Sequence, residues 1–181
     1  LVASTPLVGS MVRALVRQYC RRIPLRQGKT KLMFHCRRLG TPYVGETFLD
    51  FGGKFQVDLT DNIQRQIYFQ GHYEPEITDL IKRTLKPGDT FVDIGANTGY
   101  YTVLASLLVG ARGAVHSFEP IPYIFSEMQS NVSLNSVSNV FLNQVALCED
   151  EIEVDIFLPV EGNIGSGSLV KQNHLPGTSI R

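Results

Sequence analysis

The sequence predicts an α/β fold in which helices flank a parallel sheet, with a small α+β extension before it. From Thr90 onward, apolar runs typical of buried strands alternate with helical segments, which implies right-handed crossovers between parallel strands. The first of these strands enters a glycine-rich turn, Gly95-Ala96-Asn97-Thr98-Gly99, and a helical segment follows at once. A hydrophobic content of 43% and a charged content of 19% over 181 residues fit a globular chain with an ample core.

Charge is unevenly distributed, although the net charge is zero. Residues 1–90 carry 14 Lys and Arg against 8 Asp and Glu, whereas residues 91–181 carry 3 against 9. Such asymmetry can mark a basic arm that contacts a membrane or nucleic acid, but a solvated basic face on a packed helix is the commoner outcome. We therefore expect no nucleic-acid partner.

The cysteines and the apolar runs bear on the compartment. Cys20, Cys36 and Cys148 are odd in number and include no C-x-x-C, so we expect neither a disulfide framework nor a metal site, and a cytoplasmic location. No apolar run approaches the roughly 18–20 residues that span a bilayer. The apolar start, Leu1 to Gly9, lacks the charged region of a secretion signal. Because residue 1 is not methionine, we expect the chain to be a piece of a longer protein.

Residues 1–60 are expected to form a basic N-terminal extension of one amphipathic helix and short strands. The helix is predicted over residues 10–23, and short strands over residues 32–36, 47–51 and 54–59. Its predicted apolar face is Val12, Leu15, Val16, Tyr19 and Ile23, and its basic stripe is Arg13, Arg17 and Arg21. The stripe leaves open a peripheral membrane contact, but packing of this helix on its own domain is the favoured interpretation.

Residues 61–181 are expected to form a partial ligand-binding domain. Helices are predicted at residues 61–69, capped by Asp61, and at residues 75–85, with an apolar face of Ile77, Leu80, Ile81 and Leu85. Next come strands at 91–94, 114–118 and 140–145, and helices at 99–108 and 124–134. A strand at 153–158 and a glycine-rich loop from Gly162 close the chain.

The glycine turn identifies the kind of ligand. A strand that ends in such a turn before a helix N-terminus presents outward backbone N–H groups to a nucleotide-like molecule. Dinucleotide sites use G-x-G-x-x-G, whereas here Asn97 stands where the middle glycine would be, and it crowds a pyrophosphate. Asp93 would repel that pyrophosphate but would favour a ligand that carries an ammonium and a sulfonium.

The second strand adds an acid at the corresponding end. Glu119 lies 24 residues beyond Gly95, the distance at which an acid reaches ribose hydroxyls, and Pro120 and Ile121 offer apolar contact for a purine. Asp93, the turn and Glu119 therefore match the amino-acid, sulfonium and ribose parts of S-adenosylmethionine. The competing interpretation is that Asp93 caps a turn and Glu119 is a surface acid.

These segments resemble a known family. Pro87 to Thr102 (P-G-D-T-F-V-D-I-G-A-N-T-G-Y-Y-T) followed by Ser117 to Pro120 (S-F-E-P) closely resembles the FkbM family of S-adenosylmethionine-dependent methyltransferases. Shorter likenesses are G-H-Y-E at residues 71–74, N-Q-V-A-L at 143–147 and G-S-G-S-L at 165–169. The resemblance covers roughly residues 60–170. It implies a class I methyltransferase (Rossmann-like) parallel sheet, incomplete at its C-terminal side.

The resemblance also implies positions for the cofactor, S-adenosylmethionine. Its methionine end would lie at Asp93, Gly95, Ala96, Asn97 and Gly99, its ribose at Glu119, and its adenine near Pro120 and the Val145–Ala146 edge. Tyr73 and Glu74 would line the methionine side, with a helix-start role for Glu74 as an equal competitor.

The implied activity is O-methylation of a small metabolite or sugar. The family's K-I-D-x-E-G-type segment and the strands that complete a seven-stranded sheet have no match here, so the first strand is expected to expose an edge. No catalytic base is assigned: His72 lies near the motif, although a lone histidine before a helix is more often structural, and His116 is expected in the core or at a sheet edge.

Three alternatives stay open. A truncated cofactor-binding module would have no catalysis of its own. A nicotinamide-dependent enzyme is disfavoured by Asp93 and Asn97. A nucleic-acid-binding arm rests on the N-terminal basic cluster alone.

Overall fold

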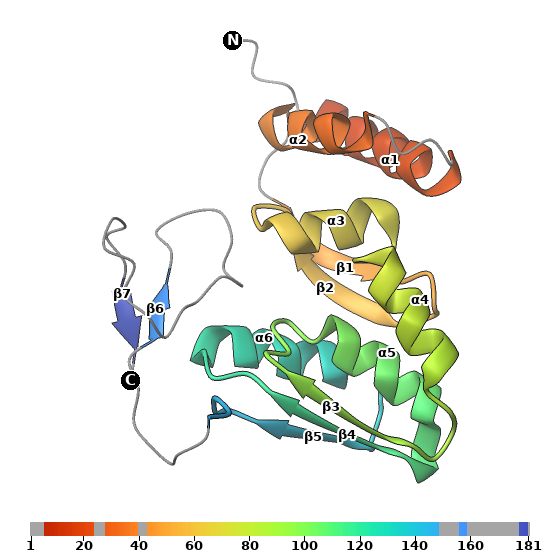
Figure 1. The fold of residues 1–181 in the computed structure, drawn as a ribbon. Helices are drawn as coiled ribbons and strands as arrows, with labels where there is room; N and C mark the ends of the chain where they lie inside the picture. Colours follow the sequence, from red (N-terminus) through yellow and green to blue (C-terminus); the bar gives the residue numbers. More distant parts are fainter. Residues whose placement is uncertain (1–5, 24–27, 40–42, 149–155, 159–177, 181) are drawn as a thin grey trace.

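The computed structural model describes residues 6–23, 28–39, 43–148, 156–158 and 178–180. The first three of these segments form layers stacked on a three-stranded sheet, and the last two pair with each other (Figure 1). The helices are α1 (Pro6–Arg22), α2 (Lys29–Leu39), α3 (Asn62–Gln70), α4 (Pro75–Thr84), α5 (Tyr100–Val109), η1 (Gly110–Arg112) and α6 (Pro122–Ser133). The strands are β1 (Val44–Phe48), β2 (Lys54–Asp58), β3 (Thr90–Ile94), β4 (Ala114–Phe118), β5 (Val140–Asn143), β6 (Ile156–Leu158) and β7 (Thr178–Ile180).

The central sheet is parallel, in the order β3-β4-β5, and this confirms the predicted α/β class. Apolar runs of four or five residues form these strands, and α5 and α6 make the crossovers. Both helices lie on one face of the sheet (Figure 1). On that face Val115 is fully buried against Ala105 and Val109 of α5.

The opposite face of this sheet is exposed within the described part of the chain. Val92 and Ile94 of β3 are 51% and 66% exposed, and Phe141 of β5 is 53% exposed. β3 pairs with β4 alone among the described strands, so it forms an edge, as expected. An apolar edge and face of this kind favour association with another polypeptide surface.

A second unit covers the outer side of α5 and α6. β1 and β2 form an antiparallel hairpin, α3 packs on β2, and α1 and α2 lie beyond α3 (Figure 1). One apolar cluster joins these layers, from Val16 of α1 through Phe55 of β2 and Ile67 of α3 to Tyr100 of α5. This core crosses the expected boundary at residue 60, and the boundary stays a prediction.

Asn131 of α6 joins the β1–β2 hairpin to the central unit. Asn131 Oδ1 accepts from the Gln56 backbone N–H at 2.7 Å, and its Nδ2 donates to the Thr98 carbonyl at 2.8 Å. Asn131 is 1% exposed. Its side chain therefore links the β2 edge to the glycine turn.

Several elements form where the sequence predicts them. Asp61 caps α3, because its side chain accepts from the Gln64 N–H at 2.8 Å. The predicted strand at 114–118 is β4, and the strand at 54–59 is β2 with one residue fewer. The strand expected at 153–158 coincides with β6 over its last three residues, whereas β7 was not expected. The G-S-G-S-L segment at 165–169 lies outside the described residues.

Two expectations for the extension are wrong. Residues 32–36 lie inside α2, where Met33 and Cys36, three positions apart, are buried on one helical face, so packing overrides strand propensity. In α1 the arginine stripe points inward: Arg13 lies over the Tyr43 ring, and Arg17 lies over the Tyr68 ring and donates to Thr47. Leu15 of the predicted apolar face is 63% exposed, because α3 and β1 present aromatic rings and oxygens to α1.

The apolar face predicted for α4 is also wrong in part. Ile77 and Leu80 are 45% and 57% exposed, whereas Thr78 is 2% exposed. The Thr78 hydroxyl donates to the Tyr73 carbonyl at 2.6 Å and lies 3.3 Å from the Tyr100 hydroxyl, so a polar contact orients this helix. No helix of the described segments is long and apolar enough to cross a membrane.

Candidate functional site

The candidate site is the edge where β3 and β4 end. The two strands run parallel with Asp93 opposite Ser117 and Ile94 opposite Phe118, so the glycine turn after β3 lies beside Glu119 after β4. Gly95 and Gly99 have φ angles of 72° and 88°, which favour glycine. At Gly99 an added Cβ would lie 2.9 Å from Cγ of Met128, so the close packing of α6 also requires glycine there.

The backbone amides of the glycine turn are all used internally, which corrects the expectation that they point outward. Gly95 and Ala96 both donate to the Phe118 carbonyl, and Gly99 donates to the Ala96 carbonyl, each at 2.9 Å. Asn97 donates to Glu119, and Thr98 donates to the Asn97 side chain. The turn therefore offers no N–H cradle for a pyrophosphate, because its tight conformation satisfies its own donors.

Asp93 is a buried carboxylate at the end of β3. It is 7% exposed, and its Oδ2 accepts from the Thr102 hydroxyl at 2.6 Å. That hydroxyl also lies 2.8 Å from Ser117 Oγ of β4. Burial raises the pKa of Asp93, and the Thr102 hydrogen bond opposes this only in part.

Glu119 joins the glycine turn to the end of β4. Its Oε2 accepts from the Asn97 N–H at 3.0 Å and its Oε1 from the Ile121 N–H at 2.9 Å. Glu119 is 5% exposed, and burial raises the pKa of this carboxyl, to which the nearby charge of Asp93 adds. Each oxygen keeps a further acceptor position for a ligand hydroxyl.

Asp93 and Glu119 share one electrostatic property. Among the described residues neither carboxylate forms an ion pair, and no basic side chain lowers either pKa. Two neighbouring buried carboxylates without a cationic partner are costly to ionise. A cationic ligand would remove that cost, whereas an anionic one would increase it.

Tyr73 and Glu74 lie against the first turn of α5. The Tyr101 hydroxyl donates to Glu74 Oε2 at 2.7 Å, and the Tyr73 ring packs near the rings of Tyr100 and Tyr101. Burial is the main cause that raises the pKa of Tyr101, and the hydrogen bond to Glu74 and the charge of Glu74 raise it further. Glu74 occupies the N-cap position of α4 without a side-chain capping bond, so its carboxylate faces α5 instead.

The residues expected near an adenine lie at the ends of β4 and β5. Pro120 and Ala146 are half-buried, and Val145 is 51% exposed. Ile121, expected beside Pro120, is 5% exposed in the core, so Pro120 is the more accessible of the two. His116 is half-buried on β4, where its ring stacks on Phe141.

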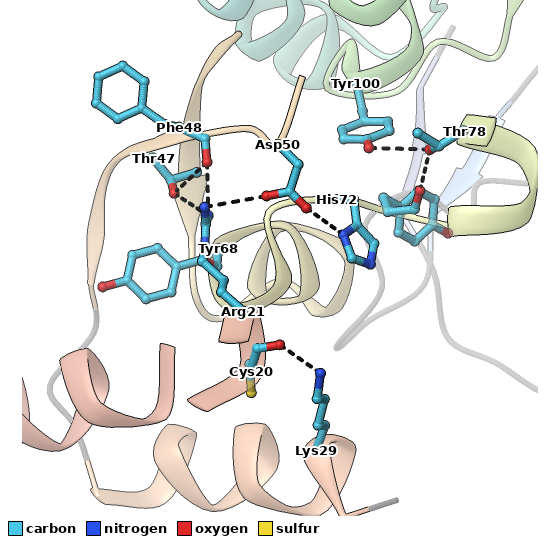
Figure 2. Close-up of polar contacts among 11 residues, drawn as sticks. Cys20, Arg21, Lys29, Thr47, Phe48, Asp50, Tyr68, His72, Thr78 and Tyr100 are labelled. Atoms are coloured by element: carbon cyan, nitrogen blue, oxygen red, sulfur yellow. Dashed lines mark hydrogen bonds and ion pairs between the residues drawn. The ribbon is translucent and has the colours of Figure 1, made fainter. Parts of the chain in front are cut away.

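Sequence reasoning missed one pair of polar residues that the structure brings together. Asp50, which follows β1, accepts from His72 through its Oδ2, with Nδ1 at 2.8 Å, and its Oδ1 lies 3.6 Å from Arg21 Nη1 (Figure 2). His72 was considered as a lone histidine, but Asp50, 22 residues away, carries no local signal. The described segments contain no cluster of three potential metal ligands.

Known proteins match the part of the chain that carries this site. The model of the protein-L-isoaspartate(D-aspartate) O-methyltransferase family matches residues 51–146. A protein-L-isoaspartate O-methyltransferase of Fervidobacterium nodosum is 38% identical over 56 residues, which are 31% of this chain and 28% of that protein. Protein-L-isoaspartate O-methyltransferase 1 of Arabidopsis thaliana is 30% identical over 67 residues, 37% of this chain and 29% of that protein.

A solved structure is similar over the same region. It is described as a SAM-dependent methyltransferase from Aquifex aeolicus, with 25% identity and a TM-score of 0.36, and the match covers 46% of this chain and 43% of that one. The chain spans less than a third of the length of the curated relatives above. The matched family differs from the FkbM family; the broader expectation, a class I S-adenosylmethionine-dependent methyltransferase, is confirmed by the family match.

Proposed function

This chain belongs to the protein-L-isoaspartate(D-aspartate) O-methyltransferase family, and from that premise we propose that it holds the methyl donor of an S-adenosylmethionine-dependent O-methyltransferase. The observation that carries the proposal is the pair of buried carboxylates, Asp93 and Glu119, with no cationic partner among the described residues. S-adenosylmethionine brings an ammonium and a sulfonium, and these supply the missing positive charge.

We assign each predicted site residue a role toward this ligand. Asp93 faces the cationic methionine end, and Glu119 accepts from the ribose hydroxyls through its remaining acceptor positions. Pro120 and Ala146 border the adenine. Tyr73 and Glu74 wall the methionine side, where the bond from Tyr101 holds the Glu74 carboxylate. Gly95, Ala96, Asn97 and Gly99 set the position of both acids and leave space for the ligand.

When bound, S-adenosylmethionine supplies an electrophilic methyl group. Transfer to an oxygen is an in-line displacement, so the contribution of these residues is to bind, to orient and to exclude water. The internally bonded glycine turn is suited to this, because its N–H donors are already satisfied and it needs little reorganisation.

The structure also disfavours the nicotinamide alternative. A dinucleotide pyrophosphate needs free backbone N–H groups, and residues 95–99 use all of theirs internally. Asp93 and Glu119 would in addition repel its charge.

Calorimetric titration tests the proposal. S-adenosylhomocysteine should bind with micromolar affinity, and NAD should not bind. Asp93→Asn and Glu119→Gln should each weaken binding about 10-fold or more, the usual cost of a lost charge-assisted contact. Asp79→Asn is the matched control, since Asp79 is exposed on α4. Binding of NAD in preference to S-adenosylhomocysteine would overturn the proposal.

Two classes of oxygen acceptor have support. The relatives are protein-L-isoaspartate O-methyltransferases, which favours a carboxylate in a peptide. The FkbM resemblance favours a hydroxyl of a small metabolite or sugar. A binding module without catalysis is the remaining alternative; it predicts binding of S-adenosylhomocysteine without methyl transfer by the full-length protein.

We further propose that residues 1–60 are an extension packed on the cofactor domain of residues 61–181, in the cytoplasm. The inward-facing arginines of α1 support packing over nucleic-acid or membrane contact. Cys20 and Cys36 are buried thiols that form no disulfide with each other, which supports a reducing compartment.

A further inference from the structure

A cavity of about 670 Å³ lies between the end of α1, the start of α2 and the loop that joins α3 to α4. Its volume is in the range of small-molecule sites. Polar and charged side chains dominate its wall, among them Arg21, Lys29, Asp50, Gln70, His72 and Glu74. None of these except Glu74 belongs to the residues proposed to hold the methyl donor.

Glu74 connects the cavity to the proposed site of the methyl donor at the ends of β3 and β4. The Glu74 carboxylate lines the cavity and also accepts from Tyr101, which lies two residues beyond Gly99. On the same loop, the Tyr73 carbonyl accepts from Thr78, whose hydroxyl lies 3.3 Å from that of Tyr100 (Figure 2). The start of α5 and the cavity wall are thus joined by direct hydrogen bonds.

His72 and Asp50 form an oriented acid–base pair in this wall. The Asp50 carboxylate can only accept, so Nδ1 of His72 is the donor of their 2.8 Å bond. A neutral imidazole protonated on Nδ1 carries its free electron pair on Nε2. Among the described residues no group is bonded to Nε2, and Figure 2 shows this nitrogen on the side of the ring away from Asp50.

The surroundings fix Asp50 for this role. Arg21 and His72 hold opposite oxygens of its carboxylate (Figure 2). The second terminal nitrogen of Arg21 donates to the Phe48 carbonyl at 2.8 Å and to the Tyr68 carbonyl at 3.2 Å. Gly71 has no side chain, and the Asp50 carboxylate occupies the space where a Cβ would lie. Three elements therefore hold the pair in one geometry.

We propose that His72 is the general base of the methyl transfer, oriented by Asp50, and that the acceptor is a hydroxyl compound seated in this cavity. The proposal rests on the function proposed above. A carboxylate acceptor is already ionised at neutral pH and needs no base, whereas a hydroxyl must lose its proton as it is methylated. An oriented histidine in the wall of a cavity that also contains Glu74 is therefore useful for the second class.

The bonds balance as follows. The acceptor oxygen forms a bond to the methyl carbon, and its O–H proton passes to Nε2 of His72. The carbon–sulfur bond of the donor breaks, and its electron pair stays on sulfur, giving the neutral thioether. The positive charge leaves the sulfonium and ends on the imidazolium, where the Asp50 carboxylate stabilises it.

The first test needs no turnover. Long-range ¹H–¹⁵N spectra of the full-length protein should show that the neutral ring of His72 carries its proton on Nδ1 and none on Nε2. Asp50→Asn should change this tautomer distribution. A proton on Nε2 of the neutral ring in the unaltered protein would overturn the proposal.

The second test separates the acceptor classes. Transfer of a radioactive methyl group is measured to two sets of probes: hydroxyl compounds (methyl glucoside, glycerol and catechol) and an isoaspartyl hexapeptide. His72→Gln should lower kcat toward the hydroxyl compounds about 100-fold, the usual contribution of a general base, with little change in KM. His35→Gln is the control, because His35 is exposed on α2.

The possible results separate the role of His72 from the proposed function itself. Equal kcat values for His72→Gln and His35→Gln would contradict the proposal, as would methylation of the peptide alone or of no hydroxyl compound by protein that binds S-adenosylhomocysteine. A parallel loss of S-adenosylhomocysteine affinity in His72→Gln would make the role structural. Failure of the unaltered protein to bind S-adenosylhomocysteine would instead refute the proposed function.

Discussion

The carboxylate of Asp50 fills the space that a side chain at Gly71 would occupy. Gly71 ends α3 with a φ of 84°, and an added Cβ would overlap Asp50 Oδ1 and lie 3.0 Å from Arg21 Nη1. The absence of a side chain at this helix end therefore permits the contacts of Asp50 with Arg21 and His72. A glycine that looks like an ordinary helix stop also holds the acid–base pair together.

We expect Gly71→Ala to destabilise the protein by about 3 kcal/mol, from about 1–2 kcal/mol of left-handed backbone strain and the displacement of Asp50. Gly52→Ala is the control: its φ is 95°, but a Cβ there meets nothing within 4 Å, so only the strain remains. Urea unfolding of both variants measures the difference. Equal losses would show that Asp50 moves aside without cost.

Asn131→Ala should cost about 2–3 kcal/mol, because two buried backbone groups, the Gln56 N–H and the Thr98 carbonyl, lose their partner. Asn135 is half-buried and also donates to the Asn131 carbonyl, but its bonds to the N–H and carbonyl of Lys54 are exposed, so in Asn135→Ala water replaces those two and the cost should stay below about 1 kcal/mol. Urea unfolding compares the two. Asn131-Val132-Ser133 matches the N-x-S glycosylation pattern, but Asn131 is 1% exposed with both polar atoms bonded, so it should stay unglycosylated.

Asp93→Asn should stabilise the ligand-free protein while weakening its response to ligand. An amide can still accept from Thr102 and carries no buried charge, so we expect the melting temperature to rise by about 2–4 °C, the equivalent of roughly 1 kcal/mol at this chain length. S-adenosylhomocysteine should then raise the melting temperature less than in the unaltered protein. A lower melting temperature without ligand would show that the Asp93 charge is stabilising.

The raised pKa values of Asp93 and Glu119 predict a pH dependence of stability. A carboxyl with a raised pKa binds more protons in the folded than in the unfolded state. Its contribution to the stability of the folded protein therefore falls as pH rises from the ordinary carboxyl pKa, about 4, through the pKa of the folded state. Asp93→Asn should remove part of this decline. Melting temperatures between about pH 4 and pH 8 measure it, and superimposable slopes for the two proteins would contradict the assignment.

Val92→Lys should reduce self-association. Val92 is 51% exposed on the uncovered face of β3, an edge strand within the described residues, and a charge there opposes pairing of edges. Thr84→Lys adds the same charge at an exposed position of α4. Sedimentation velocity at several concentrations distinguishes them. If both variants associate to the same extent, this face is not the surface involved.

Local signals predict much of the fold. The β3–turn–α5 sequence, the cap at Asp61 and the strand at 114–118 depend on neighbouring residues, and the structure confirms them. The strand expected at 32–36 and the apolar face of α1 are wrong for one reason. Which side chains become buried depends on the surfaces that pack against these helices, and the contacts of α1 with Tyr43, Thr47 and Tyr68 join residues about 30 to 50 positions apart.

The candidate site divides in the same way. Asp93, Glu119 and the glycines can be found in the sequence, because each ends a strand or forms the turn that follows it. Only the packed structure shows that the amides of the turn are all bonded internally. It also shows that neither acid has a cationic partner among the described residues.

The sequence by itself determined the alternation of strands and helices, the turn and the two acids, because periodicity and glycine placement act over a few residues. Tertiary structure alone decided that the arginines of α1 face inward and that Asp50 meets His72 over Gly71. Contacts between residues 20 or more positions apart form only when the layers pack. The physical reason is that burial and pairing, rather than local propensity, set the energy of a charged side chain.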